Sequence, residues 1–302
     1  MSKLPLVVII LVTWNNAEDA LECLASLTRL DYTNHKVVVV DNCSTDGTSE
    51  HVRRAFPHAL LIENTENLGY AGGCNAGLKF AFEELGAAYC LILNNDTVVQ
   101  DSHFLDLLVS SAEQDTSIGI VAPLVLNLSP SPTIQCAGVW VNYYTGRARL
   151  ITRIGQRPIW TDTVHGCAFM VRREVADRVG LLDERFYLYW EETDYCVRVG
   201  KAGYRLLINP VAHILHKSGG SIGGRSDLYT YYFFRNRLLF MQKHAKSVHW
   251  LVLMPLLPLY ALVHIGKSFR EGHNPISTSR AIWDAWKDFR MHRFGRTKIE
   301  QL

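Results

Sequence analysis

The chain has 302 residues, 48% of them hydrophobic and 20% charged, which is the composition of an ordinary folded protein with room for one large domain plus an appendage, or for two small domains. Its 31 basic and 29 acidic residues leave a net charge of +2, so no global field favours nucleic acid as a partner. The seven cysteines are scattered singly without a Cys-x-x-Cys pair, which argues against a zinc knuckle and a disulfide framework and suits a reducing, cytosolic compartment.

The first hundred residues alternate short β-branched runs with helical patterns. The apolar run at the N-terminus ends at Thr13 without a small-residue cleavage site, so we interpret it as a buried parallel strand and not as a signal peptide. The pattern predicts strands at 6–12, 36–40, 59–62 and 89–93, and helices at 17–30, 46–55 and 72–85. This alternation predicts an α/β fold of right-handed βαβ units with a mostly parallel sheet, which binds ligands at the carboxyl ends of its strands.

The second half of the chain is less regular. Residues 123–164 are expected to contain short antiparallel strands, and they are followed by a strand at 167–171, a helix at 193–202 and a strand at 206–208. The composition changes near Asp227, where a stretch rich in aromatics and arginine is followed by one without charged residues. We therefore predict an α/β domain at 1–226 and a helical region at 227–302.

Polar residues follow the predicted strands. Asp41 ends the second strand, where a carboxylate accepts hydrogen bonds from a nucleobase or a ribose; the alternative is that it only opens a turn, and Asp46 is expected to cap the next helix. The glycine-rich segment 66–77 is neither a Walker loop nor a dinucleotide fingerprint, but its glycines permit a phosphate to approach a helix N-terminus.

Two later segments carry titratable groups. Asp96 follows a buried strand and could supply one carboxylate to a divalent metal, with a hydrogen bond from Asn94, although Asn-Asn-Asp is also common in simple turns. His213 and His216 follow the strand 206–208 beside the Gly-Ser loop 218–221, which makes them metal or phosphate candidates, although a lone histidine is more often structural.

An aromatic segment leads into three carboxylates. Tyr187, Tyr189 and Trp190 precede Glu191, Glu192 and Asp194; a solvated helix start would favour the acids but would not require the aromatics. Aromatic surroundings raise a carboxyl pKa toward that of a useful general base.

These segments, taken in order, resemble family 2 glycosyltransferases with a GT-A fold, specifically the rhamnosyltransferase-like branch. The resemblance spans about residues 5–245 and rests on six motifs: VTWN (12–15), VDNCSTDG (40–47), NLGYAGGCN (67–75), LNND (93–96), HGCAFMVRR (165–173) and YLYWEETD (187–194). It implies an inverting, metal-dependent transfer of a sugar from a dTDP- or UDP-linked donor, best matched by dTDP-rhamnose. The acceptor would be a glycan or a lipid-linked saccharide in cell-envelope polysaccharide synthesis.

The resemblance also implies roles for individual residues. Trp14 would lie against the base and Asp41 would bind the base or ribose, and the other donor-binding residues would be Thr13, Asn15, Asn67, Gly69, Asn75 and Asn95. Asp96 and His216 would bind Mg²⁺ or Mn²⁺. Glu192 stands where the family usually has a catalytic Asp, with Glu191 and Asp194 as alternatives.

Two departures from the family pattern matter. The metal motif is Asn94-Asn95-Asp96, with one acidic residue in place of two, and the presumed base is Glu, one methylene longer than Asp. A sugar nucleotidyltransferase is an alternative, but it needs a basic glycine-rich loop after the first strand. The other alternative is a catalytically degenerate scaffold that recruits partners to the membrane.

The C-terminal region suggests a membrane. Residues 247–266 carry no formal charge, but Pro255 and Pro258 disfavour a single straight spanning helix. Residues 280–294 form a basic amphipathic pattern with Trp286 on the apolar face. We expect peripheral attachment at the cytoplasmic face of the cell membrane; the alternative is a helical pair that packs on the catalytic domain or forms a dimer contact.

Overall fold

The computed structural model describes residues 4–217 and 226–297. Its strands are β1 (Val7–Thr13), β2 (His35–Asp41), β3 (Leu60–Glu63), β4 (Tyr89–Asn94), β5 (Thr97–Val98), β6 (Ile118–Asn127), β7 (Ile134–Cys136), β8 (Val139–Asn142), β9 (Arg147–Leu150), β10 (Ile159–Trp160), β11 (Ala168–Arg172) and β12 (Arg205–His216). Its helices are α1 (Ala17–Leu27), α2 (Thr48–Ala55), α3 (Gly69–Lys79), the π-helical segment η1 (Phe80–Glu84), α4 (Phe104–Glu113), α5 (Arg173–Val179), α6 (Glu191–Lys201), α7 (Asp227–His244), α8 (Ser247–Arg270) and α9 (Pro275–Arg290).

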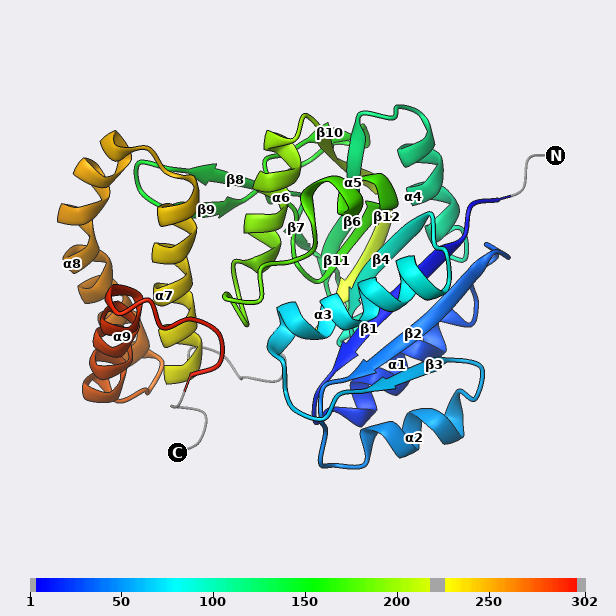
Figure 1. Ribbon diagram of the computed structural model, residues 1–302, viewed down its shortest axis with the longest axis horizontal. Coiled ribbons are helices and arrows are strands. Elements are labelled where there is room, and N and C mark those ends of the chain that lie inside the picture. Colours follow the sequence, from blue (N-terminus) through cyan, green and yellow to red (C-terminus); the bar gives the residue numbers. More distant parts are fainter. Residues whose placement is uncertain (1–3, 218–225, 298–302) are drawn as a thin grey trace.

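One large sheet runs through the molecule in the order β10-β12-β6-β11-β4-β1-β2-β3, with β5 paired to β12 and β7 to β6 (Figure 1). Strands β1 to β4 are parallel, as are β6 and β12, while β11 runs antiparallel between β4 and β6. All seven residues of β1 are buried, because helices cover the strand on both faces. The predicted α/β fold with a mostly parallel sheet and a helical C-terminus is confirmed.

Two apolar layers flank the sheet. One face of β1, including Ile9 and Leu11, packs with residues of α1 and α4, and the other face, including Ile10, packs with α3, α5 and α6. The alternation of side chains along each strand sends successive residues to opposite layers. The carboxyl ends of β1, β2 and β4 therefore meet at one edge of the sheet, where the loops are free to carry polar groups.

The predicted elements are present, with shifted bounds. Helix α6 begins at Glu191, two residues before the predicted start, so the acidic residues stand in its first turn. Strand β12 is much longer than the predicted 206–208, and His213 and His216 lie inside it and not after its end, because β12 continues past a register shift to pair with β6 and β5. The segment predicted as one helix at 72–85 begins at Gly69 and ends as the π-helical η1.

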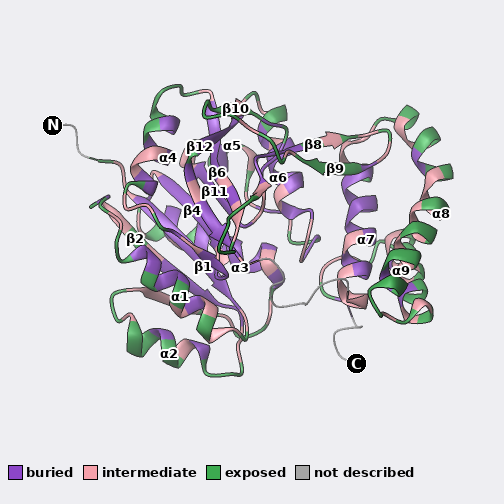
Figure 2. Cartoon of the chain, turned by 180° about the vertical axis from the view of Figure 1, so that it is seen from behind, coloured by how far each residue is buried: buried purple, intermediate pink, exposed green. Residues whose placement is uncertain are grey.

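The C-terminal helices lie at the end of the molecule away from β2 and β3 (Figure 1). Residues from α7, α8 and α9 pack with Phe186, Tyr187 and Trp190 of the loop before α6 in two further apolar clusters. Within the described residues α8 is the one helix long and apolar enough to cross a membrane, judged by length and composition alone. It continues through Pro255 and Pro258, and its outer face is largely exposed (Figure 2).

Candidate active site

A pocket of about 680 Å³ opens at the carboxyl ends of β1 and β4, between the sheet, the start of α6 and the start of α7. Nine residues predicted from the sequence line it: Thr13, Trp14, Asn67, Gly69, Asn95, Asp96, Glu191, Glu192 and His216. They come from both halves of the chain, so the fold alone brings them together.

Three other predicted donor ligands, Asn15, Asp41 and Asn75, lie outside the pocket lining. Asn15 accepts hydrogen bonds from the amide and hydroxyl of Thr45. Asp41 is buried and accepts from the hydroxyls of Ser44 and Ser49, although its neighbour Asn42 lines the pocket. Their roles in donor binding stay predictions.

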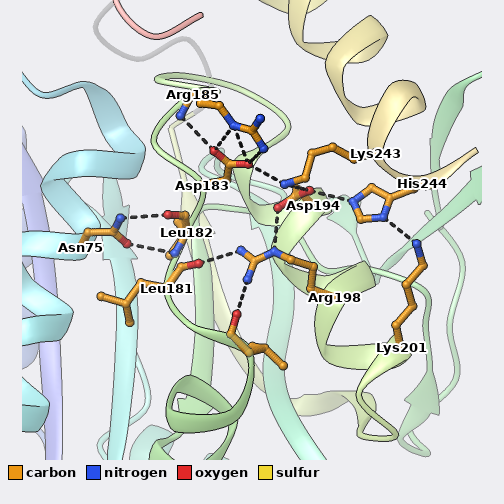
Figure 3. Close-up of polar contacts among 11 residues, drawn as sticks. Asn75, Leu181, Leu182, Asp183, Arg185, Asp194, Arg198, Lys201, Lys243 and His244 are labelled. Carbon is orange, nitrogen blue, oxygen red and sulfur yellow. Dashed lines mark hydrogen bonds and ion pairs between the residues drawn. The ribbon is translucent and has the colours of Figure 1, made fainter.

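Asn75 has a visible structural role. Its amide joins α3 to the loop before α6, because Nδ2 donates to the Leu182 carbonyl at 2.9 Å and Oδ1 accepts from the Leu182 amide at 3.0 Å (Figure 3). The same Nδ2 donates to Glu184. Its contact with the donor stays a prediction.

The glycine-rich turn forms one wall of the pocket. Asn42 donates to Asn67 Oδ1 and to the Gly69 carbonyl, both at 2.9 Å, and accepts from the Leu68 amide. Gly69 has φ +72°, and a Cβ there would lie 2.4 Å from the Tyr187 ring. Only glycine fits this position, which lets the turn pack against the aromatic segment that precedes α6.

Asp96 and His216 form a buried polar corner of the pocket. Asp96 Oδ1 lies 3.3 Å from His216 Nε2, but the contact lacks hydrogen-bond geometry, and Oδ1 has no hydrogen-bond partner in the described part of the chain. The Asn94 side-chain oxygen is likewise buried and unpartnered among these residues. Unsatisfied hard oxygen donors beside an imidazole nitrogen fit a divalent cation.

His165 and Cys167 lie beside this corner. Ligand atoms of His165, Cys167 and His216 are within 4.8 Å of one another. His165 Nδ1, however, accepts a hydrogen bond from the Cys167 amide at 3.2 Å, so the neutral ring carries its proton on Nε2 and offers no free lone pair in this rotamer. Burial lowers the pKa of His165 to about 4, which keeps the ring neutral. The metal candidates therefore remain Asp96 and His216.

Glu191 and Glu192 stand side by side in the first turn of α6. Glu191 is buried, and its Oε2 has no hydrogen-bond partner among the described residues. Burial, followed by the charge of Glu192, raises the pKa of Glu191 well above its ordinary value. Burial also raises the pKa of Glu192, although the Thr193 hydroxyl, 3.0 Å from Oε1, works in the opposite direction. Glu191 is buried and Glu192 half-buried, and two such neighbouring carboxyls ionise in separate steps, in which Glu192 loses its proton first.

Asp194 points away from the pocket into an ion-pair cluster (Figure 3). It is fully buried and lies 2.6 Å from Lys243 Nζ, 2.7 Å from His244 Nε2 and 2.9 Å from Arg198 Nε. Burial would raise the pKa of Asp194, but these three groups together lower it below its ordinary value. Asp194 therefore ties α6 to α7, whereas Glu191 and Glu192 face the pocket.

The aromatic segment before α6 has an unusual backbone. Tyr187, Tyr189 and Trp190 have φ values of 64°, 66° and 75°, a region that side chains other than glycine rarely adopt. Asn236 of α7, which is fully buried, donates to the carbonyls of Phe186 and Leu188 at 2.7 Å and of Tyr189 at 2.9 Å. The C-terminal region thus holds the loop that positions the acidic pair.

Sequence reasoning missed several residues of the site. Asn42 lies inside a quoted motif, but its place beside Asp41 gave no separate signal. Tyr229 and Phe233 of α7 line the pocket, and Asn236 supports its wall; all three lie in the aromatic-rich stretch assigned to a separate helical region. His213, a predicted candidate, bonds the Val211 carbonyl at 3.1 Å and does not line the pocket. The Gly-Ser loop 218–221 lies outside the described residues.

Comparison with known proteins agrees with this geometry. The family model described as "Glycosyl transferase family 2" matches residues 8–180, more than half of the chain. The chain is 26% identical over 243 residues to the low-salt glycan biosynthesis hexosyltransferase Agl10 of Haloferax volcanii, covering 76% of this chain and 74% of that protein. It is 28% identical over 242 residues to the N-acetylglucosaminyl-diphospho-decaprenol L-rhamnosyltransferase of Mycobacterium tuberculosis, covering 71% and 77%.

Solved structures show the same architecture. The mannosyltransferase PcManGT of Pyrobaculum calidifontis, solved with GDP-Man and Mn²⁺, superposes with a TM-score of 0.61 at 21% identity over 97% of this chain and 84% of that chain. The predicted GT-A fold is thereby confirmed.

Proposed function

Because this chain belongs to glycosyl transferase family 2, we propose that it moves a single sugar, with inversion, from a nucleotide diphosphate donor to a saccharide or lipid-linked acceptor. The observation that carries the proposal is the Glu191–Glu192 pair, which faces the same pocket as Asp96 and His216. A proton acceptor and a site for a diphosphate are the two parts that a sugar transfer by direct displacement requires.

The donor would occupy the part of the pocket beside β1 and β4. Trp14 offers a ring to the nucleobase, and Gly69 at the start of α3 also lines the pocket, where a helix N-terminus favours the diphosphate. dTDP-rhamnose is the proposed donor, supported by two relatives that are named as rhamnosyltransferases, at 28% and 25% identity. A UDP-hexose is the alternative.

Proton transfer is assigned to Glu192. The acceptor hydroxyl oxygen would form a bond to the anomeric carbon, the bond from that carbon to the phosphate oxygen would break, and Glu192 would take the hydroxyl proton. Glu191, held in its protonated form by burial, would leave Glu192 as the ionised member of the pair. Asp194 is occupied by ion pairs and is not proposed as the base.

The pair Asp96 and His216 would hold Mg²⁺ or Mn²⁺. Two observations support this placement: Asp96 Oδ1 has no hydrogen-bond partner among the described residues, and His216 Nε2 lies 3.3 Å from it. When bound, the ion would neutralise charge on the leaving diphosphate.

The C-terminal helices would attach the protein to the cytoplasmic face of the cell membrane. Large apolar residues of α8 recur on its outer face at helical spacing: Val248, Leu251, Val252, Leu259, Leu262, Val263 and Phe269. Leu251 is 77% exposed and Leu262 67%. Trp283 and Trp286 of α9 stack beside Arg290, a pairing typical of membrane interfaces. Such attachment would bring the pocket near lipid-linked acceptors of cell-envelope glycan synthesis.

The test measures nucleoside diphosphate release and nucleotide binding together. Purified protein and Asp96→Ala would be assayed with dTDP-rhamnose, UDP-glucose, UDP-galactose, UDP-N-acetylglucosamine and GDP-mannose, with Mg²⁺, with Mn²⁺ and with a chelator. An N-acetylglucosaminyl-diphospho-polyprenol would be the acceptor. Metal-dependent release from one donor, lost in Asp96→Ala, would establish the transfer and identify the sugar.

Calorimetry with dTDP and UDP covers the case in which the acceptor is wrong. Metal-dependent nucleotide binding without turnover would direct the search to other acceptors. Silence in both assays would exclude the catalytic proposal and favour a scaffold that recruits partners.

A further inference from the structure

His216 is held between two side-chain oxygens. Its Nδ1 lies 3.1 Å from Gln135 Oε1, and its Nε2 lies 3.3 Å from Asp96 Oδ1. Gln135 belongs to the short strand β7, which pairs with β6, whereas Asp96 follows β4. An amide oxygen only accepts hydrogen bonds, so a neutral imidazole bonded to it must carry its proton on Nδ1. Nε2 then keeps its lone pair.

This tautomer leaves two lone pairs facing each other. Asp96 Oδ1 has no hydrogen-bond donor within residues 4–217 and 226–297, although it is buried. An imidazole nitrogen without a proton does not satisfy it. A cation that binds both atoms removes this conflict, because both are metal ligands of the kind found in transition-metal sites.

The backbone leaves the ring little other freedom. His216 pairs with Thr97 across the β5–β12 ladder, and the amide of Lys217 donates to the Asp96 carbonyl at 3.0 Å. The His216 carbonyl in turn accepts from the Leu128 amide at 3.0 Å. These bonds hold the backbone at Asp96 and at His216 in place. The tautomer and orientation of the His216 ring therefore depend on its side-chain partner Gln135.

We propose that Gln135 is a positioning residue that selects the Nδ1-protonated tautomer of His216 and thereby presents Nε2 to a divalent cation at Asp96. The inference rests on the metal site of the proposed function. His165, the other imidazole nearby, does not replace His216, because its Nδ1 accepts from the Cys167 amide and its proton lies on Nε2.

The experiment titrates Mn²⁺ into the full chain and follows free Mn²⁺ by electron paramagnetic resonance, first alone and then with UDP or dTDP. Gln135→Leu removes the acceptor at similar volume, Gln135→Glu keeps an acceptor and makes it stronger, and Gln135→Asn draws it back by one methylene. Gln156→Leu is the matched control, since Gln156 is exposed. Nitrogen-15 spectra of histidine-labelled protein, taken at about pH 8 where an ordinary imidazole is neutral, report the tautomer directly.

Gln135→Leu should raise the Mn²⁺ dissociation constant by about 10- to 100-fold, the usual effect of losing a residue that orients a metal ligand. Its His216 proton should move from Nδ1 to Nε2. Gln135→Glu should bind at least as tightly as the natural protein, Gln135→Asn should be intermediate, and Gln156→Leu should be unchanged. If Gln135→Leu melts early, the Glu and Asn variants carry the comparison.

Two results would overturn the inference, and they are distinguishable. Loss of Mn²⁺ binding in Asp96→Ala, with all Gln135 variants within about twofold of the natural protein, would refute the role of Gln135 and leave the metal site intact. Unchanged Mn²⁺ binding in Asp96→Ala would refute the metal site itself and the inference with it.

Discussion

Asn236 Nδ2 donates a hydrogen bond to the Tyr189 carbonyl at 2.9 Å, and so a helix of the C-terminal region holds the loop that ends in the acidic pair. The same amide bonds the carbonyls of Phe186 and Leu188. Left-handed backbone at Tyr187, Tyr189 and Trp190 persists only where its surroundings impose it. Asn236 is therefore central to the geometry of the site although it does not line the pocket.

Replacing Asn236 should disturb turnover more than donor binding. In Asn236→Ala the loop before α6 loses its three hydrogen bonds from Asn236. Misplacing a catalytic group by about 1 Å lowers the rate by up to 10²-fold, so we expect kcat to fall roughly 10- to 100-fold. Steady-state kinetics measure kcat, and nucleotide binding by calorimetry checks that the donor site beside β1 and β4 stays folded. Gln242→Ala, an exposed amide on the same helix, is the control. Equal kcat in both variants would show that the hydrogen bonds of Asn236 do not position Glu192.

The two glutamates should respond differently to loss of charge. Glu192→Gln removes the proposed base and should lower kcat by about 10²- to 10⁴-fold, with nucleotide binding largely retained. Glu191→Gln resembles the protonated carboxyl that burial already favours, so its kcat should stay within about tenfold. A severe loss in Glu191→Gln with near-normal turnover in Glu192→Gln would reverse the assignment.

The pH profile of kcat should report the same base. Burial raises the pKa of Glu192 above the ordinary value of 4.5, and the base works only when ionised. Activity should therefore fall with decreasing pH through a pKa higher than that of an exposed glutamate. The profile is measured as kcat against pH at saturating donor and acceptor. An acid limb at or below pH 4.5 would contradict the assignment of Glu192 as the base.

The Asp194 cluster should contribute to stability in a pH-dependent way. Its folded-state pKa is lowered, so its contribution is fully present above the unfolded-state value near 3.8 and is lost as the pH falls through the folded-state pKa. Asp194→Asn leaves Lys243 and Arg198 without their charged partner and should lower the free energy of unfolding at neutral pH by about 2 kcal/mol. The loss stays below that of a fully buried pair because both cationic side chains keep partial solvent access.

Chemical denaturation at neutral and acidic pH measures this difference. The gap between Asp194→Asn and the natural protein should narrow toward low pH. A gap of constant size would mean that the hydrogen bonds of Asp194, and not its charge, stabilise the junction of α6 and α7.

The outer face of α8 should bind vesicles. The double variant Leu251→Glu with Leu262→Glu places two charges on the apolar face and should reduce co-sedimentation with phosphatidylcholine–phosphatidylglycerol vesicles at least roughly tenfold. Val211→Glu, at a residue 52% exposed on β12, adds a charge away from α8 and should bind normally. If the natural protein does not sediment with vesicles, the helices serve a protein contact.

Local patterns predicted the first four long strands and the three helices between them, but not α4, α5 or the parallel strand β6. The apolar runs of β1, β2 and β4 are continuous because both faces are buried, and the turns between them contain the expected polar residues. The resemblance to the family pointed to Asp96, Glu191, Glu192 and His216, and the structure brings all four to one pocket. These elements were readable because their signals lie within short stretches of sequence.

The sequence did not reveal the length of β12 or the integration of α7 into the site. His216 reaches Asp96 because β12 pairs with β5 and β6 far beyond its predicted end. Tyr229 and Phe233 line the pocket although they lie beyond residue 226, where the sequence predicts the end of the α/β domain.

Three chemically similar carboxylates show most clearly what cannot be predicted from the sequence. Glu191, Glu192 and Asp194 follow each other within four positions, and their order along the chain gives no basis for separating their roles. In the folded chain, helical geometry turns Asp194 toward Lys243 and His244, while Glu191 and Glu192 face the pocket. The sequence determined that the acids are present, and only tertiary structure decided which are charged and free, because desolvation and ion pairing depend on residues about fifty positions away.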